Sequence, residues 1–229
     1  MIDGTTKLKK LEGLYQIHKR CVTETDSACT LGCATCCTRN VTLTSLEGAF
    51  LLSRLDEREK KEAMDRILAR RDRPRLIPLA TVNAMARLCA EGRDLPEEAC
   101  DPAWAPCPLL DSDMACTVYE HRPFACRAMV SQAACGNYGQ ADIDDYLFTL
   151  NNVFMQVIEH MDQGGAFANL IDMLLHLSDK DALDHYLKQG VHPSPPPSFL
   201  LNRPIGILMV PPEHRDKIKP VILSLQECM

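Results

Sequence analysis

The sequence predicts a mainly α-helical protein with little or no sheet, in which a helical scaffold surrounds a long, irregular, metal-stapled cysteine-rich region. Three observations predict this fold. Apolar residues recur with helical periodicity before residue 92 and after residue 141. Between these stretches, residues 93–140 are rich in Pro, Asp, Cys and Gly and show no long periodicity. The chain also contains 12 cysteines, and an ordered loop of this length is uncommon without a function or an internal cross-link.

Periodicity and end signals place the individual helices. Thr44 and Glu47 have the spacing of a capping box, in which a hydroxyl and a carboxylate satisfy free amide groups at a helix start. Glycines at 164–165 and at 190 end two later helices. The only strand-like stretch, residues 115–119, is too short for a large sheet. We expect helices at residues 5–21, 45–71, 78–91, 142–163 and 166–189, and one more within 211–229.

The helices and the cysteine-rich region are expected to form one domain. We assign residues 1–190 to a single helical domain that contains the cysteine-cluster region 25–140. Residues 192–197 (HPSPPP) favour an extended linker, because closely spaced prolines hold the chain extended. Residues 191–229 are therefore expected to be a Pro-rich linker and a C-terminal tail, and this tail is a candidate surface for a protein partner.

Charge and composition argue against several classes of partner. The 229 residues carry a net charge of −6, whereas non-specific nucleic-acid binding and polybasic membrane anchoring both need clustered cations. The first 20 residues lack the apolar core of a secretory signal. No uncharged apolar run approaches the roughly 18 residues of a membrane-spanning helix. We therefore expect a cytoplasmic protein that binds no nucleic acid and no membrane.

The cysteines fall into two clusters that indicate metal ligation or redox chemistry, because disulfides are rare in a reducing cytoplasm. The first cluster has the pattern C-x3-C-x2-C-C, and its C-x2-C step can place two thiolates on one ion from a tight turn. Cys36 and Cys37 are adjacent, so their side chains diverge. Either they serve two different centres, or one is a ligand and the other lies behind it or is redox-active. The eight candidate metal ligands are Cys29, Cys33, Cys36, Cys37, Cys107, Cys116, Cys126 and Cys135.

Further residues near these clusters are candidates for the same site. Thiolate sites suit Zn²⁺ or an iron–sulfur cluster, and both kinds of centre are anionic. A buried anionic centre needs cationic partners, so we assign Arg39, Arg122 and Arg127, which follow or flank candidate ligands, as cofactor-binding residues. His121 is the best candidate nitrogen ligand. Trp104 is expected to pack over the cysteine site and shield it from water.

The two cysteine blocks and the stretch that follows the first block resemble a known family. The segments that carry the resemblance are Cys29–Cys37, Val41–Glu47 (VTLTSLE), Cys107–Asp111 (CPLLD), Cys116–Pro123 (CTVYEHRP) and Cys126-Arg127. Together they are similar to the CxxCxxCC cysteine-cluster family, a zinc- or iron-chelating domain, over residues 25–136. Leu109 and Val118 replace the usual Phe and Ile. The first cysteine spacing is x3 instead of x2, which leaves the role of Cys29 open.

The resemblance implies metal or iron–sulfur binding without a defined reaction. Our first hypothesis is a metal-binding protein whose two cysteine blocks converge on Zn²⁺ or an iron–sulfur cluster. The alternative is an iron–sulfur oxidoreductase or electron-transfer protein. Flagellin lysine methylases look similar in their cysteine cluster, so a protein-modifying methylase is a more remote alternative. The sequence contains no familiar nucleotide-binding, protease or hydrolase motif, and we assign no catalytic residue.

Overall fold

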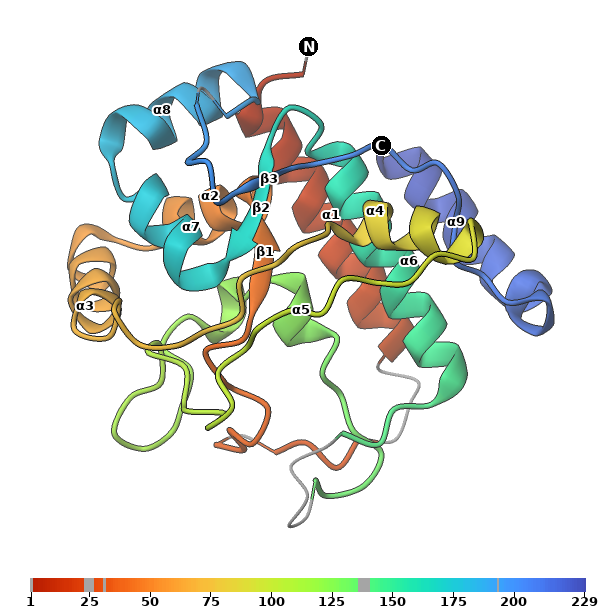
Figure 1. Ribbon diagram of the computed structural model, residues 1–229, viewed down its shortest axis with the longest axis horizontal. Helices are drawn as coiled ribbons and strands as arrows, with labels where there is room; N and C mark the ends of the chain where they lie inside the picture. The colour runs from red at the N-terminus through yellow and green to blue at the C-terminus, as the bar shows by residue number, and fades with distance from the viewer. Residues whose placement is uncertain (1, 23–26, 31, 136–140, 193) are drawn as a thin grey trace.

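The computed structural model describes residues 2–22, 27–30, 32–135, 141–192 and 194–229, and it confirms the mainly α-helical fold (Figure 1). Figure 1 shows the helices around a small central sheet, with loops from both cysteine blocks at the lower edge. The longer helices are α1 (Gly4–Val22), α2 (Ser45–Arg54), α3 (Glu57–Leu68), α4 (Val82–Ala90), α6 (Asp145–Met161), α7 (Leu170–Leu177), α8 (Lys180–Gln189) and α9 (Arg215–Cys228). The shorter helical segments are η1 (Tyr119–His121), α5 (Phe124–Arg127) and η3 (Pro212–His214).

The sheet is antiparallel and has the strand order β1-β2-β3. Its strands are β1 (Thr42–Thr44), β2 (Ala166–Asn169) and β3 (Leu200–Leu201). Leu43 pairs with Ala168, and Phe167 pairs with Leu200. Strands this short carry too few residues for a period-2 pattern to be visible in the sequence. The prediction of little or no sheet is therefore confirmed, and the short strands that do form could not be recognised from the sequence.

Two predicted long helices are divided in the structure, because polar side chains cap new helix starts inside them. The predicted helix 45–71 breaks at Leu55, where Asp56 accepts the amide of Glu59 and begins α3 with a second capping box. The predicted helix 166–189 begins as β2, and Asn169 and Asp179 then cap α7 and α8. Of the described helices, none combines the length and the apolar composition needed to cross a bilayer.

The strand-like stretch at residues 115–119 forms no strand in the structure. Cys116 forms a single bridge to Leu110, which closes a tight loop, and the chain then turns into η1. At the other end of the chain, α9 packs against α1 and buries Ile218 and Leu225. The division of the chain at residue 190 stays a prediction.

A buried carboxylate, Asp162, joins the elements that meet at the end of α6. It accepts hydrogen bonds from Ser45 Oγ (2.7 Å), Asn202 Nδ2 (2.8 Å) and Tyr186 Oη (2.5 Å), and Lys7 Nζ lies 3.6 Å away. Burial raises the pKa of Asp162 to about 6, whereas the Lys7 charge and these donors favour the ionised form. The pairing of a buried acid with several donors holds α1, α2 and α8 against the sheet.

Two histidines stack where the Pro-rich segment crosses α7. The rings of His176 and His192 lie 4.5 Å apart, and both pack edge-on against Phe199. His192 is 7% exposed, and neither of its ring nitrogens has a hydrogen-bond partner. Burial, together with the charges of His176 and His185, lowers the pKa of His192 to about 4. The native protein therefore holds a neutral imidazole at this position.

We expect this imidazole to destabilise the fold in acid. Between pH 6.5 and about 4 the unfolded chain binds a proton that native His192 does not, so the free energy of unfolding falls as the pH falls. The expected loss is on the order of 2 kcal/mol, and the variant His192→Phe should lack it. Urea unfolding at a series of pH values measures the difference. The unchanged chain, measured alongside, serves as the reference; an equal pH dependence of the unchanged chain and His192→Phe contradicts the prediction.

Candidate metal centre

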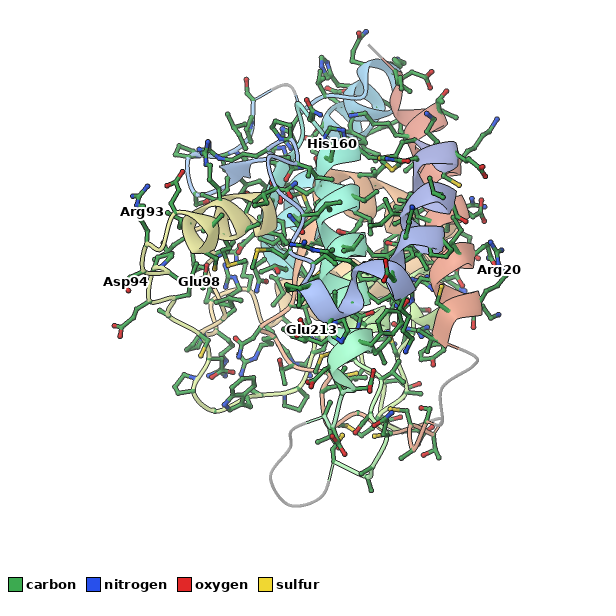
Figure 2. All side chains as sticks on the ribbon, turned by 90° about the vertical axis from the view of Figure 1, so that its right-hand side faces the viewer. Arg20, Arg93, Asp94, Glu98, His160 and Glu213 are labelled. Atoms are coloured by element: carbon green, nitrogen blue, oxygen red, sulfur yellow. The ribbon has the colours of Figure 1, made fainter. Side chains whose placement is uncertain are left out.

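Backbone hydrogen bonds join the two cysteine blocks directly. The amide of Cys107 donates to the carbonyl of Cys37 at 2.9 Å, and the amide of Arg39 donates to the carbonyl of Ala105 at 3.1 Å. An isolated antiparallel bridge between Thr38 and Pro106 lies between these contacts. Figure 2 shows sulfur atoms among the loops at the lower end of the molecule. Segments about 70 residues apart in the sequence are thus held side by side before any metal is considered.

A tight loop brings Cys107 and Cys116 to its two ends. The amide of Thr117 donates to the carbonyl of Leu109 at 3.0 Å, next to the bridge between residues 110 and 116. Asp111 Oδ1 accepts the amides of residues 113 and 115, each at 2.9 Å. The Asp111 carboxylate therefore satisfies two backbone amides of the turn, a role typical of Asp in turns.

Cys126 is positioned by a buried carboxylate on the helical scaffold. Cys126 lies on α5, and the first amide of that helix, on Phe124, donates to Glu47 Oε1 at 2.7 Å. Glu47 Oε2 accepts the amide of Thr44 at 2.9 Å, so the same residue completes the capping box of α2. Tyr15 Oη donates to Glu47 at 3.3 Å. The VTLTSLE stretch and the second cysteine block are therefore parts of one hydrogen-bonded unit.

Arg127 fixes the turn that precedes Cys126. Its guanidinium donates to the carbonyl of Arg122 at 2.9 Å and to that of Glu120 at 2.6 Å. The same guanidinium lies 4.1 Å from the ring centre of Tyr15, a cation–π contact. Burial lowers the pKa of Arg127, but the guanidinium remains charged. Arg127 thus holds the backbone around Cys126 through carbonyl groups.

Five thiols from both blocks influence one another's ionisation, and we call them the inner thiol group: Cys36, Cys37, Cys107, Cys116 and Cys126. Burial, together with the Cys116 charge, raises the pKa of Cys107 to about 11. Burial also raises the pKa of Cys126, together with the charges of Cys107, Cys116 and Cys36. A hydrogen bond between the adjacent thiols lowers the pKa of Cys36 to about 6 and raises that of Cys37. These five thiols therefore lie within the range over which their charges act on one another.

Of the three arginines assigned from the sequence, Arg122 is the one whose charge reaches the thiols. Its charge lowers the pKa of Cys36, Cys116 and Cys126. Arg39 instead pairs with the buried Asp101, with Nη2 and Oδ2 3.1 Å apart. A cation beside several thiols favours their ionised forms, which are the forms that bind metals. The cofactor-binding role of all three arginines stays a prediction.

In the part of the chain that the structure describes, the contacts of the remaining three predicted ligands, Cys29, Cys33 and Cys135, do not include the inner thiol group. The thiol of Cys29 accepts the amide of Ser131 at 3.4 Å, which places residue 29 beside the end of the second block. Cys33 is exposed and contacts Thr35, and Cys135 is partly buried. Among the residues that the structure describes, no three His, Cys, Asp or Glu side chains already have a metal-holding arrangement. The inner thiols are therefore neighbours and not yet a closed coordination shell.

The expected shielding role of Trp104 is wrong. Its side chain is 65% exposed, and its backbone has the left-handed φ of 48°. The cause is Asp101, whose carboxylate accepts the amides of Ala103 and Ala105 and so turns the chain outward. His121 packs beside Phe50, with 6.3 Å between ring centres. Its role as a nitrogen ligand stays a prediction.

Sequence reasoning missed the supporting role of three residues. Tyr15, Glu47 and Asp101 orient the cysteine-bearing loops although none was a candidate site residue. The role of Glu47 could have been inferred from the sequence, because this residue belongs both to the capping box and to the VTLTSLE stretch. Tyr15 carried no such signal, because its partner Glu47 lies far away in the sequence. Asp101 carried none for its pairing with the distant Arg39, although its bonds to Ala103 and Ala105 are local.

Comparison with known proteins identified one family. Residues 28–141 match the model of the CxxCxxCC family, which is described as "Putative zinc- or iron-chelating domain". The matched range contains all eight predicted ligands. No curated protein and no solved structure matched the chain significantly.

We expect Glu47→Gln to loosen the turn around Cys126. The amide group of Gln turns a donor toward the Thr44 or Phe124 amide, and a buried unsatisfied donor costs about 1–3 kcal/mol. Urea unfolding should show that loss, and mass spectrometry should show faster alkylation of Cys126 in the folded protein. Glu59→Gln is the matched control, because Glu59 fills the same capping-box position in the exposed helix α3. Equal effects of the two variants contradict the prediction.

Proposed function

Since the chain belongs to the CxxCxxCC family through residues 28–141, we propose that it is a metal-binding protein that holds one zinc or iron ion in the inner thiol group. The proposed ligands are Cys107, Cys116, Cys126 and one of the adjacent pair Cys36 and Cys37. The observation that carries the proposal is the backbone pairing of the two blocks, in which the amide of Cys107 donates to the carbonyl of Cys37 at 2.9 Å beside the bridge between Thr38 and Pro106. The effect of these partly buried thiols on one another's pKa supports it.

The donor set suits such an ion. Thiolates are the preferred ligands of structural zinc and also bind iron, with metal–sulfur distances of about 2.3 Å for zinc. A bound ion would take the place of thiol protons, because only thiolates ligate metals. Four thiolates around a divalent ion leave a charge of −2, which Arg122 offsets in part. The bound ion supplies a cross-link between the two cysteine blocks.

The outer thiols, Cys29, Cys33 and Cys135, are proposed as ligands of a second centre. Their support is the pairing of residues 28–29 with Ser131, which aligns the first block with the end of the second. The described residues include all 12 cysteines, and none of these forms a disulfide bond in the structure. This agrees with the proposed cytoplasmic location, where thiols stay reduced.

Anaerobic purification followed by elemental analysis tests the inner site. We expect bound zinc or iron, and we expect Cys107→Ser, Cys116→Ser and Cys126→Ser each to remove about one equivalent. Comparison of Cys36→Ser with Cys37→Ser identifies the fourth ligand. Cys89→Ser is the control, because Cys89 is exposed on α4. Full metal retention in a Cys107/Cys126 double variant contradicts the proposal. Brown protein with equal amounts of iron and acid-labile sulfide indicates the iron–sulfur alternative.

Metal removal should unfold the cysteine-rich region while leaving the long helices folded. Structural zinc contributes roughly 10–16 kcal/mol of apparent binding free energy, as much as the whole stability of about 5–15 kcal/mol of a typical domain. We expect chelation to make residues 93–140 sensitive to protease. Helical circular dichroism should fall only in part, because most of the core shared by α1, α2 and α6 lies outside residues 93–140, whereas Leu109, Val118 and Phe124 belong to it. An unchanged digestion pattern after complete metal removal argues against the cross-linking role.

A further inference from the structure

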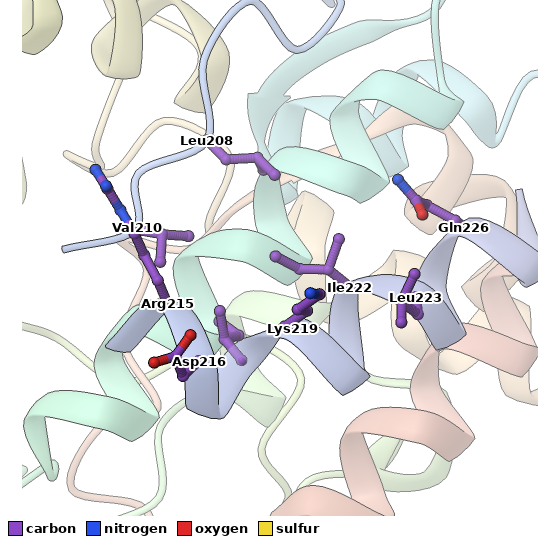
Figure 3. Close-up of a pocket in the computed structure, with 9 residues that line it drawn as sticks. Leu208, Val210, Arg215, Asp216, Lys219, Ile222, Leu223 and Gln226 are labelled. Atoms are coloured by element: carbon purple, nitrogen blue, oxygen red, sulfur yellow. The ribbon is translucent and has the colours of Figure 1, made fainter. Parts of the chain in front are cut away.

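A groove runs along α9 on a part of the molecule away from the cysteine loops. It has a volume of about 410 Å³. Figure 3 shows one side formed by α9 and the other by Leu208 and Val210. In Figures 1 and 2, α9 and the loops at the lower end occupy different parts of the molecule. The groove is thus a feature that metal binding does not use.

Both walls of the groove are fixed to the central helix α6. The buried side chain of Gln156 donates to the carbonyl of Ile207 at 2.8 Å and accepts the amide of Met209 at 2.9 Å. On the other side, His214 bonds to Thr149 at 2.9 Å just before α9 begins. A groove with both walls fixed loses little conformational entropy when a ligand enters.

The groove is apolar along its floor and cationic along its rim. Ile222 and Leu223 line it from α9, and Leu223 is 53% exposed. Arg215 and Lys219 lie one turn apart on the same helix face, with Asp216 as the only acid among the lining residues that the structure describes. This excess of positive charge stands on a chain whose net charge is −6. The charge of the groove is therefore a local feature and not a reflection of the whole surface.

We propose that this groove binds an amphipathic helix of a partner protein, with apolar side chains on its floor and carboxylates opposite Arg215 and Lys219. From Arg215 to Gln226 the groove follows α9 for about 16 Å, the length of three turns of a bound helix. Helices bind apolar grooves through residues spaced three and four apart. Charge complementarity indicates that the partner helix is acidic, because opposite charges steer association and like charges oppose it. The site lies within the tail that the sequence marked for a protein partner.

The test uses a labelled amphipathic peptide of about 16 residues with Leu on one face and Glu on both flanks of that face. A second peptide carries Lys in place of Glu. Fluorescence anisotropy with the full-length chain should show that the acidic peptide binds and that added salt weakens it. Charge reversal in the double variant Arg215→Glu/Lys219→Glu should weaken the acidic peptide about tenfold and let the basic peptide bind.

The double variant Lys180→Glu/Lys188→Glu on α8 is the matched control, because it changes the net charge equally on another exposed surface. It should leave binding unchanged, and circular dichroism confirms that both double variants fold. The proposal is overturned by equal binding of the two peptides, by no binding of the acidic peptide at about 1 mM, or by equal loss in the control. Self-association of the chain that Leu223→Glu abolishes also overturns it, because the occupant is then a second copy.

Discussion

The cysteine-rich region depends on one buried carboxylate, that of Glu47. A single side chain caps α2, receives the first amide of α5 and accepts the hydroxyl of Tyr15. Burial raises the pKa of this carboxyl, while the donors around it favour its ionised form. The scaffold and the turn that carries Cys126 therefore share one polar contact. In a region with little regular structure, such a contact replaces the ladder of hydrogen bonds that a sheet would provide.

Backbone hydrogen bonds and cysteine side chains contribute differently to the order of the cysteine-rich region. Hydrogen bonds between residues 37 and 107, and across the loop 107–116, bring the thiols close without any ion. Burial and neighbouring thiol charges raise the pKa of Cys107 and Cys126, which keeps these two thiols protonated. In the function proposed above, a metal ion would replace such protons with one attractive centre. The polypeptide would then supply the arrangement, and the ion would close it.

The sequence predicted the features that depend on local pattern. Periodicity found most helices, and Thr44 with Glu47 marked the start of α2. It did not predict the break at Asp56, where a cap competes with continued apolar periodicity. The separation of the eight candidate ligands into an inner and an outer group depends on which backbone segments pair, and cysteine spacing does not encode that pairing. Trp104 is exposed although its apolar side chain favours burial, because a turn around Asp101 directs the chain outward at this position.

The first helix of the chain is completed by some of its last residues. Lys7 donates to the carbonyl of Gly190, 183 residues later, and α9 covers part of α1. These contacts join segments that are far apart in the sequence, and the apolar face of α1 is covered only after both segments have docked on it. Folding must therefore close a long loop of chain before α1 is buried, which slows the final assembly of the core.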